Sequence, residues 1–217
     1  LGLAQPVAYA ETERQTIATH ESGHATIAYL VAQHRKLEVL SIIKRKAALG
    51  LLSHSETEER WTRSQGEIEG LIRIAMGGLV AEELFFGQTS SGVAGDLQAA
   101  TQAAAQMVGS FGMAGTLVSL DAVSTPGSPN LVAKVLGEDA GRAAVETILD
   151  HARQDVRRLL GTHRYLVEGL RDALLEREEL IGDEIGAVLE AARSRHDEGV
   201  VDLRADADEV TPDLSAS

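Results

Sequence analysis

Two histidines four residues apart, with a glutamate beside the first, constrain this chain more than any other feature. They lie in residues 19–25, which read T-H-E-S-G-H-A. In an α-helix, 3.6 residues per turn place His20 and His24 on the same face, with Cβ atoms roughly 5–6 Å apart. Two imidazoles at that separation can both bind one metal ion at about 2.0–2.1 Å, the usual zinc–nitrogen distance. The spacing therefore predicts a helix that carries a metal site on one face.

Glu21 gives this spacing a catalytic meaning. It lies about 100° around the helix from His20, so its carboxylate can reach the open position of the ion and accept a proton from a water there. The arrangement is the H-E-x-x-H motif of zinc hydrolases. A purely structural alternative exists, because buried histidines are commonly satisfied by hydrogen bonds alone. The two histidines share their helical spacing with a buried stripe formed by Ile17, Ala28 and Val31.

Composition indicates a folded and mainly helical chain. Of its 217 residues 44% are hydrophobic, only 3% are aromatic and four are proline, which favours a helical interior of small aliphatic side chains. The sequence contains no run of about 18 apolar residues, so it predicts no membrane span. The absence of cysteine excludes disulfides and thiolate zinc sites, and it fits a cytoplasmic setting. A net charge of −13 argues against nucleic acid as a partner.

The pattern of apolar residues predicts the following elements. Helices are expected at about 11–33, 65–86 and 96–111, and three further helices after residue 137 form a C-terminal bundle. Residues 37–55 are rich in β-branched residues and predict one or two short strands. Such a strand is either an ordinary core strand or an edge that holds an extended polypeptide, whose backbone Gly50 would let approach closely.

We divide the chain into four parts. Residues 1–10 are interpreted as a truncated linker, and residues 11–136 as the core that carries the metal site. Residues 137–196 are expected to be a C-terminal helical part of the same domain. Residues 197–217 are strongly acidic and are expected to be a disordered tail.

A catalytic zinc needs a third protein ligand besides the two histidines. The spacing leaves several candidates open, namely Glu82, Glu83, Asp96, His34 and His54. A glutamate from a following helix is chemically suitable. Asp96 follows a loop of small residues that allows the backbone to fold closely over the site, although an aspartate at the start of a helix also serves as a cap.

Several motifs follow one another in an order that is typical of one peptidase family. Residues 20–25 (H-E-S-G-H-A) are similar to H-E-A-G-H-A, and residues 42–50 to I-I-P-R-G-x-A-L-G. Residues 77–83 (G-G-L-V-A-E-E) are similar to G-G-R-x-A-E-E, residues 91–97 (S-G-V-A-G-D-L) to T-G-A-S-N-D-L, and residues 107–113 carry the motif that follows. Together, these motifs resemble the peptidase domain of the FtsH family of membrane-anchored, ATP-dependent zinc proteases.

The resemblance implies a zincin-like helical metalloprotease domain with one Zn²⁺ per chain. By position in the motifs, it implies His20, His24 and Asp96 as zinc ligands and Glu21 as the general base. Glu82 and Glu83 then become structural or supporting residues. The implied reaction is endoproteolysis of unfolded or membrane protein substrates.

Four positions depart from the family motifs. Ser22 replaces alanine, Lys44 replaces the strand proline, Leu79 replaces arginine and Gly95 replaces asparagine. None of these changes removes an implied ligand or the base. The change to Gly95 is expected to loosen the placement of Asp96.

The resemblance also implies partners that this sequence does not contain. It implies an upstream ATPase module, a homohexamer, and a full-length protein tethered to the cytoplasmic face of a membrane. No G-x-x-x-x-G-K-[S/T] phosphate loop occurs, so this chain is not expected to hydrolyse ATP itself. Two alternatives stay open: a catalytically silent hexameric scaffold, and a zinc peptidase that acts without an ATPase.

Overall fold

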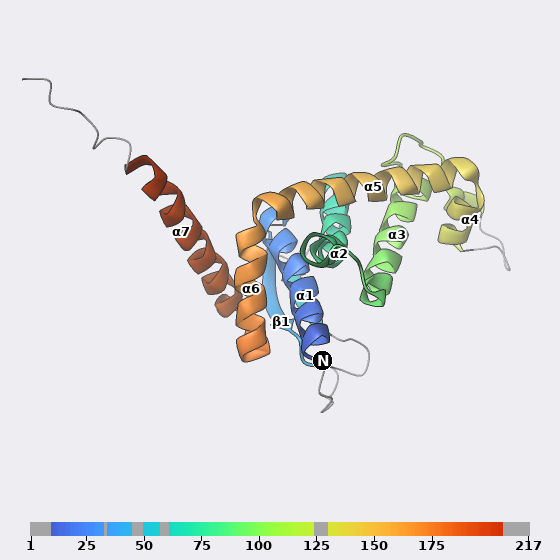
Figure 1. Ribbon diagram of the computed structural model, residues 1–217. Helices are drawn as coiled ribbons and strands as arrows, with labels where there is room; N and C mark the ends of the chain where they lie inside the picture. Colours follow the sequence, from blue (N-terminus) through green and yellow to red (C-terminus); the bar gives the residue numbers. More distant parts are fainter. Residues whose placement is uncertain (1–9, 33, 45–49, 57–60, 124–129, 206–217) are drawn as a thin grey trace, which may run out of the picture.

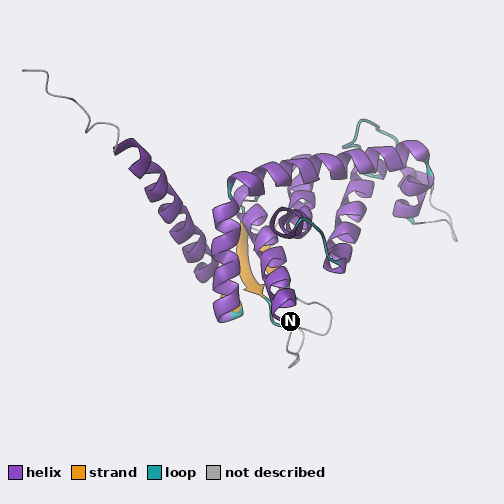
Figure 2. Ribbon diagram, viewed as in Figure 1, coloured by secondary structure: helices purple, strands orange, loops and turns teal. Residues whose placement is uncertain are grey.

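The computed structural model describes residues 10–32, 34–44, 50–56, 61–123 and 130–205. Helices make up most of this part of the chain, and one small sheet lies against them (Figures 1 and 2). The prediction of a mainly α fold with a C-terminal set of helices is therefore confirmed. No helix in the described ranges is long and apolar enough to cross a membrane.

The helices and strands have the following bounds. The α-helices of the described residues are α1 (Glu11–Val31), α2 (Gln65–Phe86), α3 (Ala94–Gly109), α4 (Leu131–Gly137), α5 (Asp139–Thr162), α6 (Arg164–Arg177) and α7 (Asp183–Ala205). The strands are β1 (Arg35–Ser41), β2 (Leu51–Glu56) and β3 (Glu179–Ile181). They form an antiparallel sheet in the order β2-β1-β3.

Helix α1 is the central element of the fold. It lies between α2 and α6 and also contacts β1 (Figure 1). Its contact with α2 is backbone against backbone, because a Cβ built on Gly77 would lie 2.8 Å from the carbonyl oxygen of Gly23. Only glycine permits so close an approach. This contact explains why α2 carries a glycine at position 77, in its middle.

Helix α2 has well-defined ends. The Ser64 hydroxyl accepts a hydrogen bond from the Glu67 backbone N–H at 3.3 Å, and the Glu67 carboxylate accepts one from the Ser64 N–H at 2.7 Å. This reciprocal pair is a capping box. At the other end, Gly87 adopts a left-handed conformation with φ of 71°, which glycine adopts without strain. Local hydrogen bonds and backbone conformation therefore define where α2 begins and ends.

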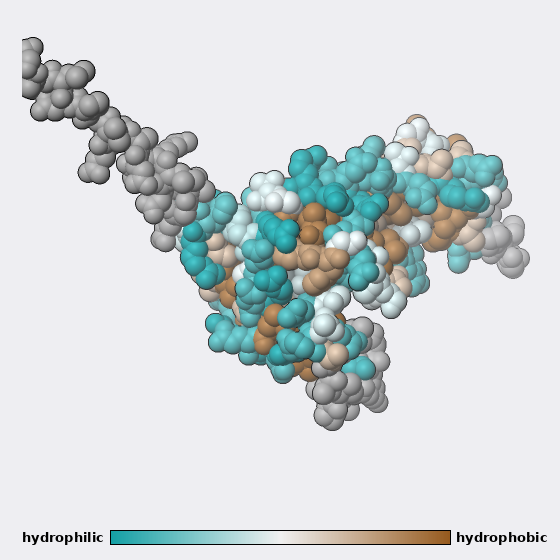
Figure 3. Space-filling model, viewed as in Figure 1, coloured by the Kyte–Doolittle hydropathy of each residue, from teal (hydrophilic) through white to brown (hydrophobic). Residues whose placement is uncertain are grey.

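Two groups of buried apolar side chains hold the helices together. One joins α2, α3 and α5 and includes Ile72, Met107 and Leu160, while the other joins α1, α6, α7 and the sheet and includes Leu40 and Leu170. Figure 3 shows hydrophilic residues along the outer side of α5 and apolar residues beneath it. Residues of α1 belong to both groups, Ile27 to the first and Ala25 to the second, so this helix is held on two sides.

Three features of the C-terminal half differ from what the sequence predicts. Strand β3 was not expected, because three residues are too short for a readable alternation; it pairs with β1 opposite Val39, Leu40 and Ser41. The short helix α4 was also not expected. Helix α7 continues to Ala205, past Asp197, where the acidic tail is expected to begin. Residues 1–9 and 206–217, from the expected linker and tail, lie outside the described residues.

Candidate metal centre

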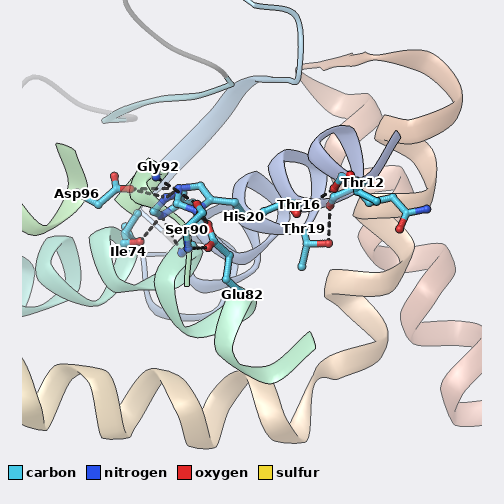
Figure 4. A network of polar contacts seen from close by, with 12 residues as sticks. Thr12, Thr16, Thr19, His20, Ile74, Glu82, Ser90, Gly92 and Asp96 are labelled. Atoms are coloured by element: carbon cyan, nitrogen blue, oxygen red, sulfur yellow. Dashed lines mark hydrogen bonds and ion pairs between the residues drawn. The ribbon is translucent and has the colours of Figure 1, made fainter. Parts of the chain in front are cut away.

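Three side chains from two helices converge on one point, and Figure 4 shows two of them, His20 and Asp96. The His20 and His24 side chains of α1 bring their Nε2 atoms to 3.0 Å from each other. Asp96, in the first turn of α3, places Oδ2 3.1 Å from His20 Nε2 and 3.3 Å from His24 Nε2. Ligands on a tetrahedral zinc at about 2.0–2.1 Å lie roughly 3.3 Å apart. The three atoms therefore have the spacing of three ligands to one zinc ion.

The outer nitrogen of each imidazole is held by a hydrogen-bond acceptor. His20 Nδ1 lies 2.7 Å from Glu82 Oε1, and His24 Nδ1 lies 2.6 Å from the carbonyl oxygen of Ile74. A carbonyl only accepts, so His24 Nδ1 carries the hydrogen; the Gly78 N–H also approaches this nitrogen, but at 3.3 Å. Both Nε2 atoms then face Asp96. Metal-binding histidines are typically oriented in this way.

Glu82 is buried on α2 and makes several hydrogen bonds. Besides the hydrogen from His20, its carboxylate accepts hydrogen bonds from the backbone N–H and, at 3.0 Å, from the hydroxyl of Ser90. Burial raises the pKa of Glu82, but these bonds outweigh burial and lower it below its usual value. The charged carboxylate therefore fixes the orientation of the His20 ring.

Electrostatics favour a positive charge at the point of convergence. Burial lowers the pKa of His20, but hydrogen bonds to Asp96 and Glu82 outweigh this effect and raise the pKa to about 10. Burial raises the pKa of Asp96, but the bonds to His20 and His24 lower it well below its ordinary value. Without a metal, the cluster therefore retains a proton on an imidazole. A divalent cation can replace that proton and satisfy the same carboxylates.

Glu21 lies beside this point and is almost completely buried, with 8% of its surface exposed. Burial raises the pKa of its carboxyl group, while the nearby imidazoles of His24 and His20 oppose that rise. A raised pKa suits a group that must accept and release a proton near neutral pH. The position of Glu21 and its pKa shift both fit the role of a general base.

Two glycines make room for these side chains. A Cβ on Gly50, which precedes β2, would lie 2.6 Å from Glu21 Cγ, and a Cβ on Gly78 of α2 would lie 2.6 Å from His20 Nδ1. Gly50 was expected to admit a substrate backbone; the structure shows that the Glu21 side chain fills this space instead. Two adjacent glycines inside a helix indicate close packing against a neighbouring backbone, but at Gly78 the neighbour is the side chain of His20.

Glu83 and His54, two other candidate ligands, are not part of this cluster. Glu83 pairs with Arg153 and, at 3.1 Å, with Arg157 on α5. His54 receives a hydrogen bond from Arg35. Within the described residues, His20, His24 and Asp96 form the one cluster of three side chains with metal-ligand spacing.

The departures from the family motifs leave this centre intact. A Cβ on Gly95 would meet nothing within 4 Å, so this residue is not needed for space, and hydrogen bonds hold the adjacent Asp96. Ser22 is buried, and its hydroxyl has no hydrogen-bond partner in the described structure. We have no structural explanation for Ser22.

A cavity of about 850 Å³ opens beside the centre. Its wall includes the edge strand β2 and apolar side chains of α2 and α3, among them Leu71, Ile72, Ala75 and Ala100. His20, Glu21 and Asp96 line it as well. The cavity is large enough for several side chains of a peptide, and the candidate metal ligands and base face into it.

Comparisons with known proteins agree with these features. Residues 7–188 match the model of a family described as peptidase family M41. The chain is 35% identical over 201 residues to ATP-dependent zinc metalloprotease FtsH 3 of Conexibacter woesei, a match that covers 90% of this chain and 26% of that protein. It is 34% identical over 182 residues to FtsH 2 of Symbiobacterium thermophilum, with 82% and 30% covered. The chain thus spans less than a third of the length of these relatives.

Proposed function

Because this chain belongs to peptidase family M41, we propose that it is a zinc-dependent endopeptidase domain that cleaves unfolded protein substrates. The observation that carries the proposal is the convergence of His20 Nε2, His24 Nε2 and Asp96 Oδ2, with the buried carboxylate of Glu21 next to them. In this proposal, the three converging side chains hold one Zn²⁺ and Glu21 is the general base. A fourth position stays open for water or substrate.

A zinc ion held there supplies Lewis acidity, which makes water easier to deprotonate and stabilises negative charge on the scissile carbonyl oxygen. Glu21 accepts a proton from the attacking water and returns it to the leaving amine nitrogen. Glu82 and the Ile74 carbonyl keep the two imidazoles oriented throughout. The apolar wall of the cavity excludes water from the other side of the peptide.

The geometry of the cavity supports an extended polypeptide as the substrate. β2 lies at the edge of the sheet and lines the cavity, and such an edge can add a peptide as a further strand. A folded protein does not present a free strand to it, so substrates must be unfolded or flexible. We propose that an upstream ATPase module unfolds and delivers them, and that the assembly is a hexamer on the cytoplasmic face of a membrane. The printed names of the relatives, which describe ATP-dependent zinc metalloproteases, support this coupling.

The clustering of His20, His24 and Asp96 beside a buried Glu21 supports an active peptidase over a silent scaffold. The test is Glu21→Gln, compared with Glu13→Gln, which changes an exposed glutamate on the same helix. We expect Glu21→Gln to abolish cleavage of denatured casein while zinc content measured by mass spectrometry stays at one per chain. Glu13→Gln should leave both unchanged. Retained casein turnover in Glu21→Gln would contradict the assignment of the base.

A further inference from the structure

The two faces of strand β2 have different surroundings. Ser53 and Ser55 face Glu38 of β1, to which their hydroxyls donate hydrogen bonds at 3.3 and 2.7 Å. Leu52 and His54 alternate with these serines and line the 850 Å³ cavity. Successive side chains of a strand point to opposite faces, so the half-buried His54 belongs to the face toward the metal centre.

Arg35 fixes the protonation state of His54. Its Nε–H donates to His54 Nδ1 at 2.7 Å, and because a guanidinium can only donate, Nδ1 carries no hydrogen. The neutral ring therefore holds its hydrogen on Nε2. Burial and the positive charge of Arg35 lower the pKa of His54, which keeps the ring neutral at physiological pH.

The His54 Nε2–H is a polar donor in largely apolar surroundings. Leu51, Leu52, Leu71 and Ile72 line the same cavity, and among the described residues no acceptor bonds to this nitrogen. A ligand that covers this nitrogen removes it from water, and a donor then left without an acceptor is unfavourable. A ligand that brings an oxygen to this point therefore gains relative to one that brings a methyl group.

We propose that His54 determines specificity by donating its Nε2–H to an amide or carboxylate oxygen on a substrate side chain. This inference rests on the proposed function in one respect, namely that the ligand is a polypeptide extended along β2. The edge backbone groups of β2 pair with the backbone of such a peptide. Alternate side chains of the peptide then point to the cavity face, and one of them stands beside His54. Asn, Gln, Asp or Glu is preferred at that position.

The test uses zinc-loaded protein carrying Glu21→Gln, which binds peptides without cleaving them. A pool of unstructured peptides of random sequence is retained on the immobilised protein, and the bound fraction is sequenced by mass spectrometry. We expect residues with an acceptor oxygen to be enriched about fivefold over the input, which corresponds to one net hydrogen bond. Adding His54→Phe should abolish the enrichment, whereas His54→Gln, which restores a donor, should retain it. Ser55→Ala, on the opposite face of β2, is the matched control and should also retain it.

The cleavage sites of the active protein in denatured casein locate the preferred position relative to the scissile bond. His54→Phe should still cleave casein but lose the preference. Equal enrichment with and without His54→Phe, enrichment of acidic residues alone, or no retention of peptides would overturn the inference. A failure of the proposed function gives a different result from a failure of this inference. If the proposed function is wrong, the protein without the Glu21→Gln change leaves casein intact, while the peptide pool still reports what His54 recognises.

Discussion

Replacing Glu82 by glutamine isolates the contribution of a residue that is expected to orient a zinc ligand without touching the zinc. Glu82 accepts three hydrogen bonds, from His20 Nδ1 and from the N–H and hydroxyl of Ser90. Glutamine has one acceptor oxygen and one NH₂ group. A glutamine at position 82 therefore points its NH₂ group either at the His20 ring or at the Ser90 N–H, and in both cases one hydrogen bond is lost.

The magnitude follows from what is lost. A hydrogen bond to a charged group contributes about 1.5–3 kcal/mol, and tenfold in affinity corresponds to about 1.4 kcal/mol. Loss of one such bond therefore weakens zinc binding by about 10- to 100-fold, the range found for residues that orient metal ligands. We expect Glu82→Gln to raise the Kd for zinc by this factor.

The assay is competition for zinc against a chromophoric chelator at constant pH. The control is Glu83→Gln, because this neighbouring glutamate pairs with Arg153 and Arg157 on α5 and does not contact the site. Circular dichroism of the metal-free proteins verifies that both variants are folded. A Kd for Glu82→Gln within twofold of the unmodified protein would refute the argument that the charged carboxylate orients His20.

Three further outcomes are expected. Gly50→Ala pushes a methyl group into the Glu21 side chain, so we expect casein cleavage to fall about 100-fold with zinc retained. Gly95→Ala, with open space around the added methyl group, should leave cleavage unchanged. Equal activities of the two variants would contradict the steric argument. Gly77→Ala should lower the free energy of unfolding, measured in urea, by about 1–3 kcal/mol through overpacking. Gly70→Ala on the same helix should not lower it, because the added methyl group has open space around it. Equal losses of stability in the two variants would refute the close helix contact. The pKa of His20 rises from 6.5 to about 10 on folding. The metal-free protein should therefore lose stability as the pH rises from about 6.5 to 10. A free energy of unfolding that increases over this pH range would contradict the prediction.

The sequence predicted the first half of the site for a simple physical reason. His20, Glu21 and His24 lie within one and a half helical turns, so their relative positions depend only on the helical repeat. The helix that carries them was predicted from the same periodicity and is present as α1. Local geometry of this kind is fully contained in the spacing of residues.

The third ligand was not predictable from spacing, because it depends on how helices pack. Glu82 and Asp96 both carry a carboxylate and both follow the two histidines in the sequence, so residue type and order do not distinguish them as ligands. The close contact of Gly23 with Gly77 brings α2 to the outer side of the His20 ring, where Glu82 meets Nδ1 rather than Nε2. Only the family resemblance implied Asp96, and its role as a ligand stays a prediction that the geometry supports.

The features that were not predicted from the sequence are either very short or depend on contacts between distant parts of the chain. β3 has three residues and exists because β1 offers it a free edge. Ser90 and the Ile74 carbonyl act through backbone groups or a single hydroxyl, which leave no pattern in the sequence. Gly50 was recognised as a point of close approach, but the partner, Glu21, became evident only from the fold.

A crystal structure of the zinc-loaded protein with anomalous data at the zinc edge tests the central claim most directly. We expect one anomalous peak within about 2.0–2.2 Å of His20 Nε2, His24 Nε2 and an Asp96 carboxylate oxygen, with Glu82 still on His20 Nδ1. A peak bound by Glu82 in place of Asp96, or no peak between the two imidazoles, would contradict the account.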